Sequence, residues 1–152
     1  HTDGFLREYR AVCIGVPRPE SGVIDLPIGR DERSAVRRCV RPDGQPAVSR
    51  YEVLKTDGTR SLLRLLPQTG RTHQLRVHMA AVGCPLAGDW LYGQEDPDLI
   101  SRPALHSARM ALRHPVTGEA LEFTAPLPED MARLLPGKPN GVYDLQKILF
   151  GE

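Results

Sequence analysis

Proline and glycine set the strongest constraint on how this chain can fold. The 152 residues contain fourteen of each, spread so that the segments between them are short. Both residue types interrupt regular structure, because proline lacks a backbone donor and glycine loses much conformational entropy on ordering. The sequence therefore predicts short strands joined by turns, with little long helix, in one domain large enough for a hydrophobic core.

Several segments between these breakers have the composition of strands. We expect strands over 9–16, 22–29, 47–54, 60–67, 108–114 and 119–126. Pro27 favours an edge position for its segment, because proline cannot donate to a neighbouring strand. Asp57–Gly58 and the sequence "PVTG" at 115–118 favour two hairpin turns. A short helix is expected over 128–135, with Pro128 in its first turn.

The clearest predicted helix lies in the stretch "QTGRTHQLRVHMAAVG" at 68–83. Thr72 is the expected N-cap and Gly83 the expected terminator, so the helix should span 72–82. Helical spacing places an apolar stripe on one side, made of Leu75, Met79 and Val82. This stripe is predicted to pack on the core.

Arg76 creates a charge problem on the same helix. Val77 and Ala80 extend the apolar surface, so the helix is expected to be buried on most sides. An unpaired buried charge costs on the order of several kcal/mol. Arg76 must therefore pair with a carboxylate or await an anion.

The charge distribution favours a polyanionic partner on one face. The formal net charge is only +1, but residues 30–50 hold six arginines against three acids. Arginine offers a planar set of donors suited to phosphate. A coding genome rich in G and C would also raise the arginine content, so the local clustering carries the argument.

Other common chemistries find no motif. The three cysteines are an odd number without a CxxC spacing, which predicts reduced and mostly buried thiols. His73 and His78 lie about 140° apart on a helix and cannot share one metal ion. The sequence has no GxSxG elbow and no phosphate-binding glycine loop. It also has no membrane-spanning run and no signal-peptide core, and we expect a cytoplasmic protein.

Residues 68–93 carry the most specific motif. The stretch "QTGRTHQLRVHMAAVGCPLAGDWLYG" is similar to the "TGR[ST]HQ[IL]RVH" block, and the "G-P-x-x-GD-x-x-YG" after it, of the RluA-type RNA pseudouridine synthases. Four further stretches resemble that family in its order: "REYRAVCIG" (7–15), "SGVIDLPIGR" (21–30), "GQPAVSRYEVL" (44–54) and "LHSARMALRHPVTGEALEFTAPLPEDM" (105–131). Arg7, Gln45 and Ser49 replace the family's usual Lys, Lys and Thr.

The resemblance covers residues 5–135 and implies an α+β pseudouridine synthase fold. Its sheet is expected to be mixed but largely antiparallel, with flanking helices. We divide the chain into a partial catalytic domain of residues 1–136 and a C-terminal tail of residues 137–152. The family's "HRLD-x-x-TSG" motif, which carries its catalytic aspartate, does not occur in the 152 residues. We expect these residues to be the C-terminal part of a catalytic domain, with that motif upstream.

The resemblance also implies roles for individual residues. Tyr9 would stack on the target uracil and help to remove the proton of carbon 5, and Arg76 would pair with the missing aspartate. Asp89 is expected to cap or orient a loop. RNA contacts are assigned to residues at the helix start and at the head of the basic stretch: Arg71, Thr72, His73, Gln74 and Arg30.

The implied substrate is a uridine in rRNA or tRNA, flipped out of its stack. The family chemistry needs no metal and no organic cofactor, and we expect a monomer with no membrane partner. One alternative is a non-catalytic RNA-binding module, which fits the absent aspartate. Another is an unrelated arginine-centred enzyme such as a phosphate-ester hydrolase.

Overall fold

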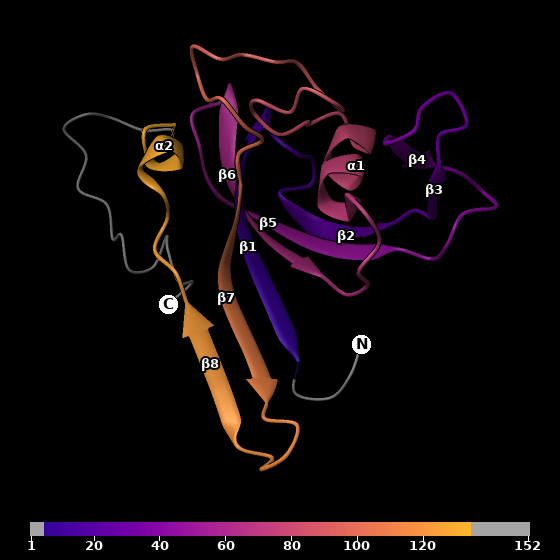
Figure 1. The fold of residues 1–152 in the computed structure, drawn as a ribbon. Coiled ribbons are helices and arrows are strands. Elements are labelled where there is room, and N and C mark those ends of the chain that lie inside the picture. The colour runs from indigo at the N-terminus through magenta and orange to yellow at the C-terminus, as the bar shows by residue number, and fades with distance from the viewer. Residues whose placement is uncertain (1–4, 135–152) are drawn as a thin grey trace.

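The computed structural model describes residues 5–134 (Figure 1). The elements in chain order are β1 (Leu6–Ile14), β2 (Ser21–Asp25), β3 (Ile28–Arg30), β4 (Arg38–Val40), β5 (Val48–Thr56), β6 (Arg60–Pro67), α1 (Gln74–Ala81), β7 (Leu105–Arg113), β8 (Ala120–Thr124) and α2 (Glu129–Ala132). Six strands form one sheet in the order β2-β5-β6-β1-β7-β8, and β3 pairs with β4 in a separate ribbon. Every ladder within 5–134 is antiparallel, so the α+β class is confirmed and its expected parallel pairing is not found there.

The two predicted hairpins are confirmed. Between β5 and β6, the carboxylate of Asp57 accepts the N–H groups of Thr59 and Arg60 at 2.8 and 2.9 Å. Gly58 has φ +90°, which glycine adopts without strain. The other hairpin joins β7 to β8 through the "PVTG" turn.

The segment predicted as one edge strand over 22–29 forms two short strands. Leu26 and Pro27 separate β2 from β3, and β2 lies at the edge of the main sheet as Pro27 suggested. The β3–β4 ribbon stands beside α1, away from the long strands (Figure 1). This break carries the basic segment out of the sheet and toward the helix.

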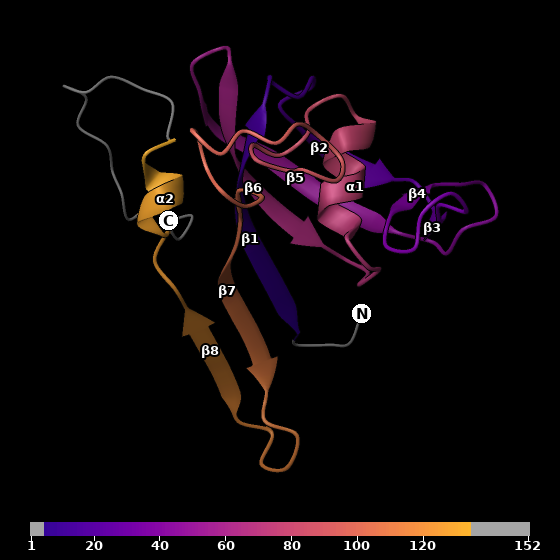
Figure 2. The same ribbon diagram turned by 45° about the horizontal axis from the view of Figure 1, so that its top comes forward.

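The main sheet has a core cluster on each face. Ala11 and Cys13 of β1 pack with Leu75 and Met79 of α1. Val12, between them in the strand, packs on the opposite face with residues that include Met131 of α2. This alternation is the period of a strand, and Figures 1 and 2 show α1 and α2 on opposite sides of β1.

Helix α1 begins two residues later than predicted and ends one residue earlier, at Ala81. Thr72 is exposed and is not the N-cap; the cap is His73, in a left-handed conformation with φ +57°. Gly83 terminates the helix as predicted: the N–H groups of Gly83 and Cys84 bond to the carbonyls of Ala80 and Met79.

The remaining expectations from the sequence concern Val82, the second helix and the cysteines. Val82 was expected in the core stripe, but it lies beyond the last turn of α1 and is 40% exposed. The helix predicted over 128–135 is the single turn α2, with Pro128 as its N-cap. All three cysteines are free thiols.

No helix among residues 5–134 is long and apolar enough to cross a membrane. The expected tail of residues 137–152 lies outside the described range.

Candidate functional site

The structure brings the two expected catalytic residues, Tyr9 and Arg76, to one cavity. Its volume is about 240 Å³. The lining comes from β1, from the end of β6, from the turn before α1, from α1 itself and from the start of β7: Arg7, Tyr9, Pro67, Thr69, Gly70, Arg71, His73, Gln74, Leu75, Arg76 and Leu105. Segments more than sixty positions apart in the sequence therefore form one concave site, with both polar and apolar walls, next to the core.

Strand β1 supplies the floor of this cavity. Arg7 and Tyr9 lie two positions apart, and both line it, as strand alternation allows. Arg7 donates from Nη2 to the carbonyl of Thr69 at 3.2 Å, which ties the strand to the turn before α1. The pairing of β1 with β7 shifts register between Glu8 and Tyr9, so Tyr9 sits at a local irregularity of the sheet.

Gln74 holds the turn that leads into α1. Its amide oxygen accepts from the Thr69 hydroxyl at 2.7 Å and from the Arg71 N–H at 3.0 Å. Its amide nitrogen donates to the Val48 carbonyl at 2.8 Å and to the Ser49 hydroxyl at 2.9 Å. The residue is buried with its amide fully hydrogen-bonded. Although Gln74 was expected to contact RNA, the structure leaves its amide no spare donor for a ligand.

The network continues from Ser49 to His78. The Nδ1 atom of His78 lies 2.8 Å from the Ser49 hydroxyl, and its Nε2 lies 2.9 Å from the Leu26 carbonyl. A carbonyl can only accept, so Nε2 carries the proton and Nδ1 accepts from Ser49. Burial lowers the pKa of His78, against the opposing effect of the Leu26 carbonyl and the charge of Asp25. A neutral His78 thus fixes α1 on the sheet.

Arg76 has a carboxylate partner within this chain, Asp89. Its Nε and Nη2 donate to the two carboxylate oxygens of Asp89 at 3.0 and 2.8 Å. Asp89 is 0% exposed, and its Oδ1 also accepts the N–H groups of Leu91 and Tyr92, both at 3.1 Å. The expected role of Asp89 in orienting a loop is confirmed.

Electrostatics keep Asp89 ionised. Burial alone would raise the pKa of Asp89, but hydrogen bonds from Arg76 and from the N–H groups of Tyr92 and Leu91 outweigh it, together with the Arg76 charge. The pKa of Asp89 is therefore lower than usual. Arg76 lines the cavity, and its Nη1 group makes no hydrogen bond within residues 5–134.

Tyr92 connects the cavity to the β3–β4 ribbon. Its ring lies under the guanidinium groups of Arg37 and Arg76, at 5.1 and 5.2 Å from the ring centroid. Its hydroxyl is 2.7 Å from Nδ1 of His73 and accepts the N–H of Arg38 at 2.9 Å. Burial lowers the pKa of His73, and so do the charges of Arg76 and Arg38. His73 is therefore neutral at pH 7, and its Nδ1 can accept from Tyr92.

A second concavity, a groove of about 330 Å³, opens beside the first. Its lining is Ile28, Gly29, Arg30, Arg38, Asp43, Gly44, Gln45, Arg71 and Thr72. Three of the residues expected to contact RNA (Arg30, Arg71 and Thr72) therefore lie in the same groove. Arg71 lines both the groove and the cavity, so the two form one continuous basic surface.

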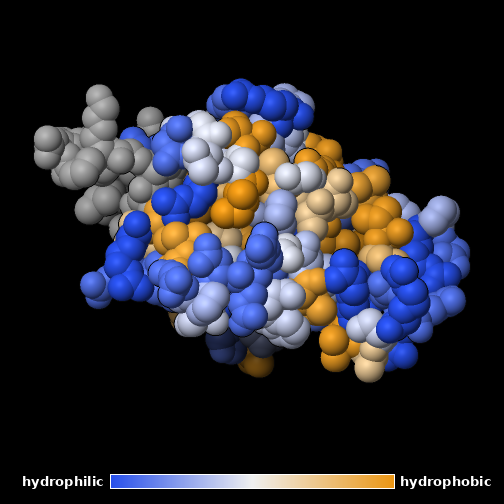
Figure 3. All heavy atoms as spheres, turned by 90° about the horizontal axis from the view of Figure 1, so that it is seen from above, coloured by the Kyte–Doolittle hydropathy of each residue, from blue (hydrophilic) through white to orange (hydrophobic). Residues whose placement is uncertain are grey.

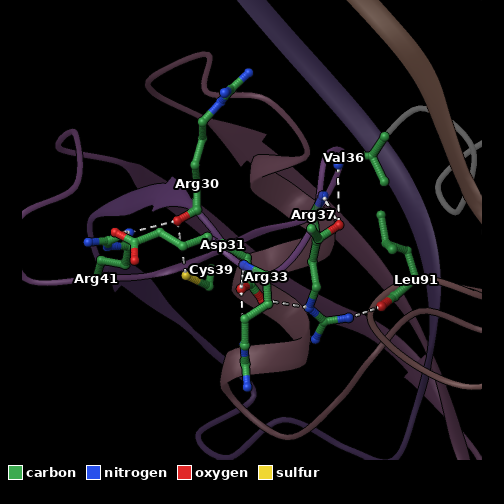
Figure 4. A network of polar contacts seen from close by, with 10 residues as sticks. Arg30, Asp31, Arg33, Val36, Arg37, Cys39, Arg41 and Leu91 are labelled. Atoms are coloured by element: carbon green, nitrogen blue, oxygen red, sulfur yellow. Dashed lines mark hydrogen bonds and ion pairs between the residues drawn. The ribbon is translucent and has the colours of Figure 1, made fainter.

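The arginines of the basic segment fall into two groups. Asp31 pairs with Arg33 and Arg37, and Arg41 pairs with Asp43 and Glu32. Arg37 also donates to the Leu91 carbonyl. By contrast, Figure 4 shows the Arg30 side chain pointing away from this network.

Arg30 and Arg38 have no side-chain partner among residues 5–134, so their donors can meet a ligand. In the view from above in Figure 3, hydrophilic side chains gather at the right-hand end, where Figure 1 places β3 and β4. The positive charge that remains unpaired in the ribbon thus faces the groove.

Sequence reasoning missed three residues of this site. Arg7 could have been found from its spacing of two from Tyr9 in one strand. Arg38 is one of six arginines in residues 30–50, and only the three-dimensional structure shows that it lacks the ion pairs that its neighbours make. Tyr92 lies in the quoted "GD-x-x-YG" motif but had no role. No group of three or more potential metal ligands occurs in the described part of the chain.

Comparisons with known proteins bear on this geometry. The family model described as RNA pseudouridylate synthase matches residues 2–81. A Chloroflexus aurantiacus protein named "Uncharacterized RNA pseudouridine synthase" is 50% identical over 128 residues, which cover 84% of this chain and 40% of that protein. The "Ribosomal large subunit pseudouridine synthase D" of Nitrosomonas europaea is 42% identical over 142 residues, covering 88% of this chain and 41% of that protein.

Solved structures agree. "Human RNA Pseudouridylate Synthase Domain Containing 1" superposes with a TM-score of 0.71 at 30% identity, over 80% of this chain and 54% of that one. "Human RNA Pseudouridylate Synthase Domain Containing 4" superposes with a TM-score of 0.66 at 26% identity, over 84% of this chain and 60% of that one. The chain spans about 40% of the length of the two curated relatives above. The RluA-type resemblance is confirmed, and the chain belongs to the RNA pseudouridylate synthase family.

Proposed function

We propose that this chain forms the tyrosine and arginine side of the catalytic site of an RNA pseudouridine synthase. The observation that carries the proposal is the cavity of about 240 Å³ that Tyr9 and Arg76 share, continuous through Arg71 with the basic groove. The reaction breaks the N-glycosidic bond of a uridine, rotates the uracil and rejoins it through carbon 5. The cavity would take the flipped uracil, and the groove would take the backbone beside it.

Tyr9 is the residue proposed to meet the base. Tyr9 is partly buried against the core and lines the cavity floor. Its ring therefore offers a fixed surface on which uracil can stack. Its hydroxyl would take part in removing the carbon-5 proton after the new bond forms, as a general base. Leu75 and Leu105 add apolar walls.

The catalytic aspartate is proposed to come from chain outside these 152 residues. The motif that carries it is absent here, and the curated relatives are more than twice as long. Asp89 holds one edge of the Arg76 guanidinium, and the Nη1 group is left to donate to a second carboxylate. Such a bond would keep the catalytic aspartate ionised and oriented.

The RNA contacts are proposed for the groove side chains Arg30, Arg38, Arg71 and Thr72, with His73 at the cavity rim. Gln74 instead positions the turn that presents them. Ribosomal RNA is the first candidate substrate, because relatives such as that of Nitrosomonas europaea carry it in their names, and tRNA is the second.

The test compares two proteins in a pseudouridine assay on ribosomal RNA. The 152 residues alone should bind RNA and form no pseudouridine, whereas a protein that also contains the "HRLD" segment should convert uridine. Tyr9→Phe in the longer protein should lower the rate of conversion and leave RNA affinity nearly unchanged. If the gene encodes no such segment and the 152 residues bind RNA without turnover, the non-catalytic RNA-binding module becomes the function.

A further inference from the structure

Trp90 is an exposed aromatic side chain beside the cavity, and neither the family motifs nor the proposed catalysis use it. It is the only tryptophan in the 152 residues, and it is 57% exposed. Single exposed apolar residues are common on protein surfaces. Phe123 of β8, for example, is also 57% exposed, but β8 is an edge strand of the sheet and lies away from α1 (Figure 1). Trp90 differs because its ring lies beside Arg76, which lines the cavity.

The backbone on both sides of Trp90 is held in place. Asp89 before it is fully buried and accepts the N–H groups of Leu91 and Tyr92 after it. The N–H of Gly93 bonds to the Asp89 carbonyl at 2.8 Å. The indole therefore projects from a fixed turn into solvent. Because this backbone is already ordered, binding through the Trp90 ring costs less conformational entropy than binding through a ring on a mobile loop.

Arg76 joins Trp90 to the cavity. The Arg76 guanidinium lies over the indole, 5.8 Å from the ring centroid, and the same guanidinium lines the cavity of Tyr9. Two hydrogen bonds to Asp89 hold the Arg76 guanidinium in place, so its position between the indole and the cavity is fixed. One residue thus separates the exposed ring from the space proposed for the flipped uracil.

We propose that Trp90 is a stacking surface for a base of the substrate RNA next to the target uridine. The inference rests on the proposed function, because it takes the cavity as the uracil site. Flipping one nucleotide removes a stacking partner from its neighbours, and unstacked bases in RNA bind aromatic side chains.

The single tryptophan gives a direct readout on the full 152-residue chain. The probe is a fluorescein-labelled oligouridylate, compared with an abasic RNA of the same length and phosphate number. Binding is followed by fluorescence anisotropy of the label. In parallel, tryptophan emission is followed with unlabelled RNA. Stacking predicts that oligouridylate quenches the Trp90 emission and that abasic RNA does not.

Variants sharpen the test. Trp90→Ala should weaken oligouridylate binding about tenfold, within the range measured for base stacking on aromatic rings. Its binding of abasic RNA should match that of the unaltered chain, and Trp90→Phe should recover part of the affinity. Phe123→Ala is the matched control and should change neither. Thermal unfolding of each variant shows whether the fold is intact.

The outcomes separate the inference from the function on which it rests. Oligouridylate binding without quenching, and without loss in Trp90→Ala, would overturn the role of Trp90 and leave the proposed function standing. An equal loss on both RNAs would also overturn it, because the effect would then act through phosphate or through Arg76. If the unaltered chain binds neither RNA, the proposed function fails, and the inference falls with it.

Discussion

Two arginines of this chain form ion pairs in the interior, Arg76 of α1 and Arg10 of β1, and their surroundings differ. The Arg10 side chain is 1% exposed and donates to Glu8 at 2.8 Å. The Arg76 side chain is 14% exposed and donates twice to Asp89. Both satisfy the requirement that a buried charge be paired, so pairing alone does not reveal function.

The difference lies in what each pair faces. Glu8 is also within 3.7 Å of Arg64 and of Arg109, so Arg10 belongs to a charge network across strands β1, β6 and β7. Arg10 lines none of the concavities described above. Arg76 lines the cavity and keeps Nη1 available. Tyr9 and Arg10 are adjacent in β1, so one strand carries a residue of the proposed catalytic site on one face and a structural ion pair on the other.

The largest expected effect on stability is at the structural pair. Glu8→Leu leaves Arg10 without its closest carboxylate and should lower the free energy of unfolding by about 3–5 kcal/mol. Denaturant unfolding at pH 7 measures it. Arg10→Leu is the matched control and should cost less, because Glu8 would still face Arg64 and Arg109. Equal losses in the two variants would contradict the network assignment.

Asp89→Asn should have a smaller effect on stability, and one that depends on pH. The variant loses a charged acceptor of several hydrogen bonds, which we expect to cost about 2–3 kcal/mol at pH 7. Because the folded pKa of Asp89 is lowered, its contribution is complete above the unfolded pKa, near 3.8, and is lost as the pH falls through the folded value.

The unaltered chain should thus lose more stability than Asp89→Asn as the pH falls below the unfolded pKa and through the lower folded pKa of Asp89. Urea unfolding across this range checks the sign. A parallel pH dependence in both proteins would mean that Asp89 is not the group that titrates.

The smallest expected effects are on RNA affinity, at single arginines of the groove. Arg71→Ala should weaken binding a fewfold and reduce the slope of log affinity against log salt by about 0.7–0.9, the value of one phosphate contact. Arg41→Ala is the control, since Asp43 and Glu32 already occupy its donors. An affinity that stayed flat from about 50 to 200 mM salt would contradict the electrostatic part of the proposal.

Local chemistry made much of the fold predictable from sequence. The hairpin at Asp57–Gly58 and the helix end at Gly83 depend on residues a few positions apart, and both are confirmed. The start of α1 was not predictable in this way. Gln74 reaches back to Thr69 and Arg71, and the chain enters the helix through a left-handed His73, so Thr72 has no capping role.

The site was predictable only in part, for the same reason. Family motifs placed Tyr9 and Arg76 together, and the shared cavity now supports that placement. The pairing of Arg76 with Asp89 spans thirteen positions and depends on how the chain turns after α1. Arg30 and Arg38 differ from Arg33 and Arg41 only in which acid lies within reach, and the three-dimensional structure decides that.

The central claim is that Arg76 serves the reaction and not only the fold. The most direct test is the single-turnover rate of pseudouridine formation at saturating RNA, for Arg76→Ala and Arg76→Lys in a protein that also contains the "HRLD" segment. Because Arg76→Ala leaves Asp89 unpaired, unfolding curves are needed to choose a temperature at which all the proteins compared are folded.

We predict that Arg76→Ala lowers the rate about 100-fold or more, as for loss of a preorganised donor, while RNA affinity changes less than about threefold. Arg71→Ala should lose affinity and keep its rate. A near-normal single-turnover rate for folded Arg76→Ala would contradict the account.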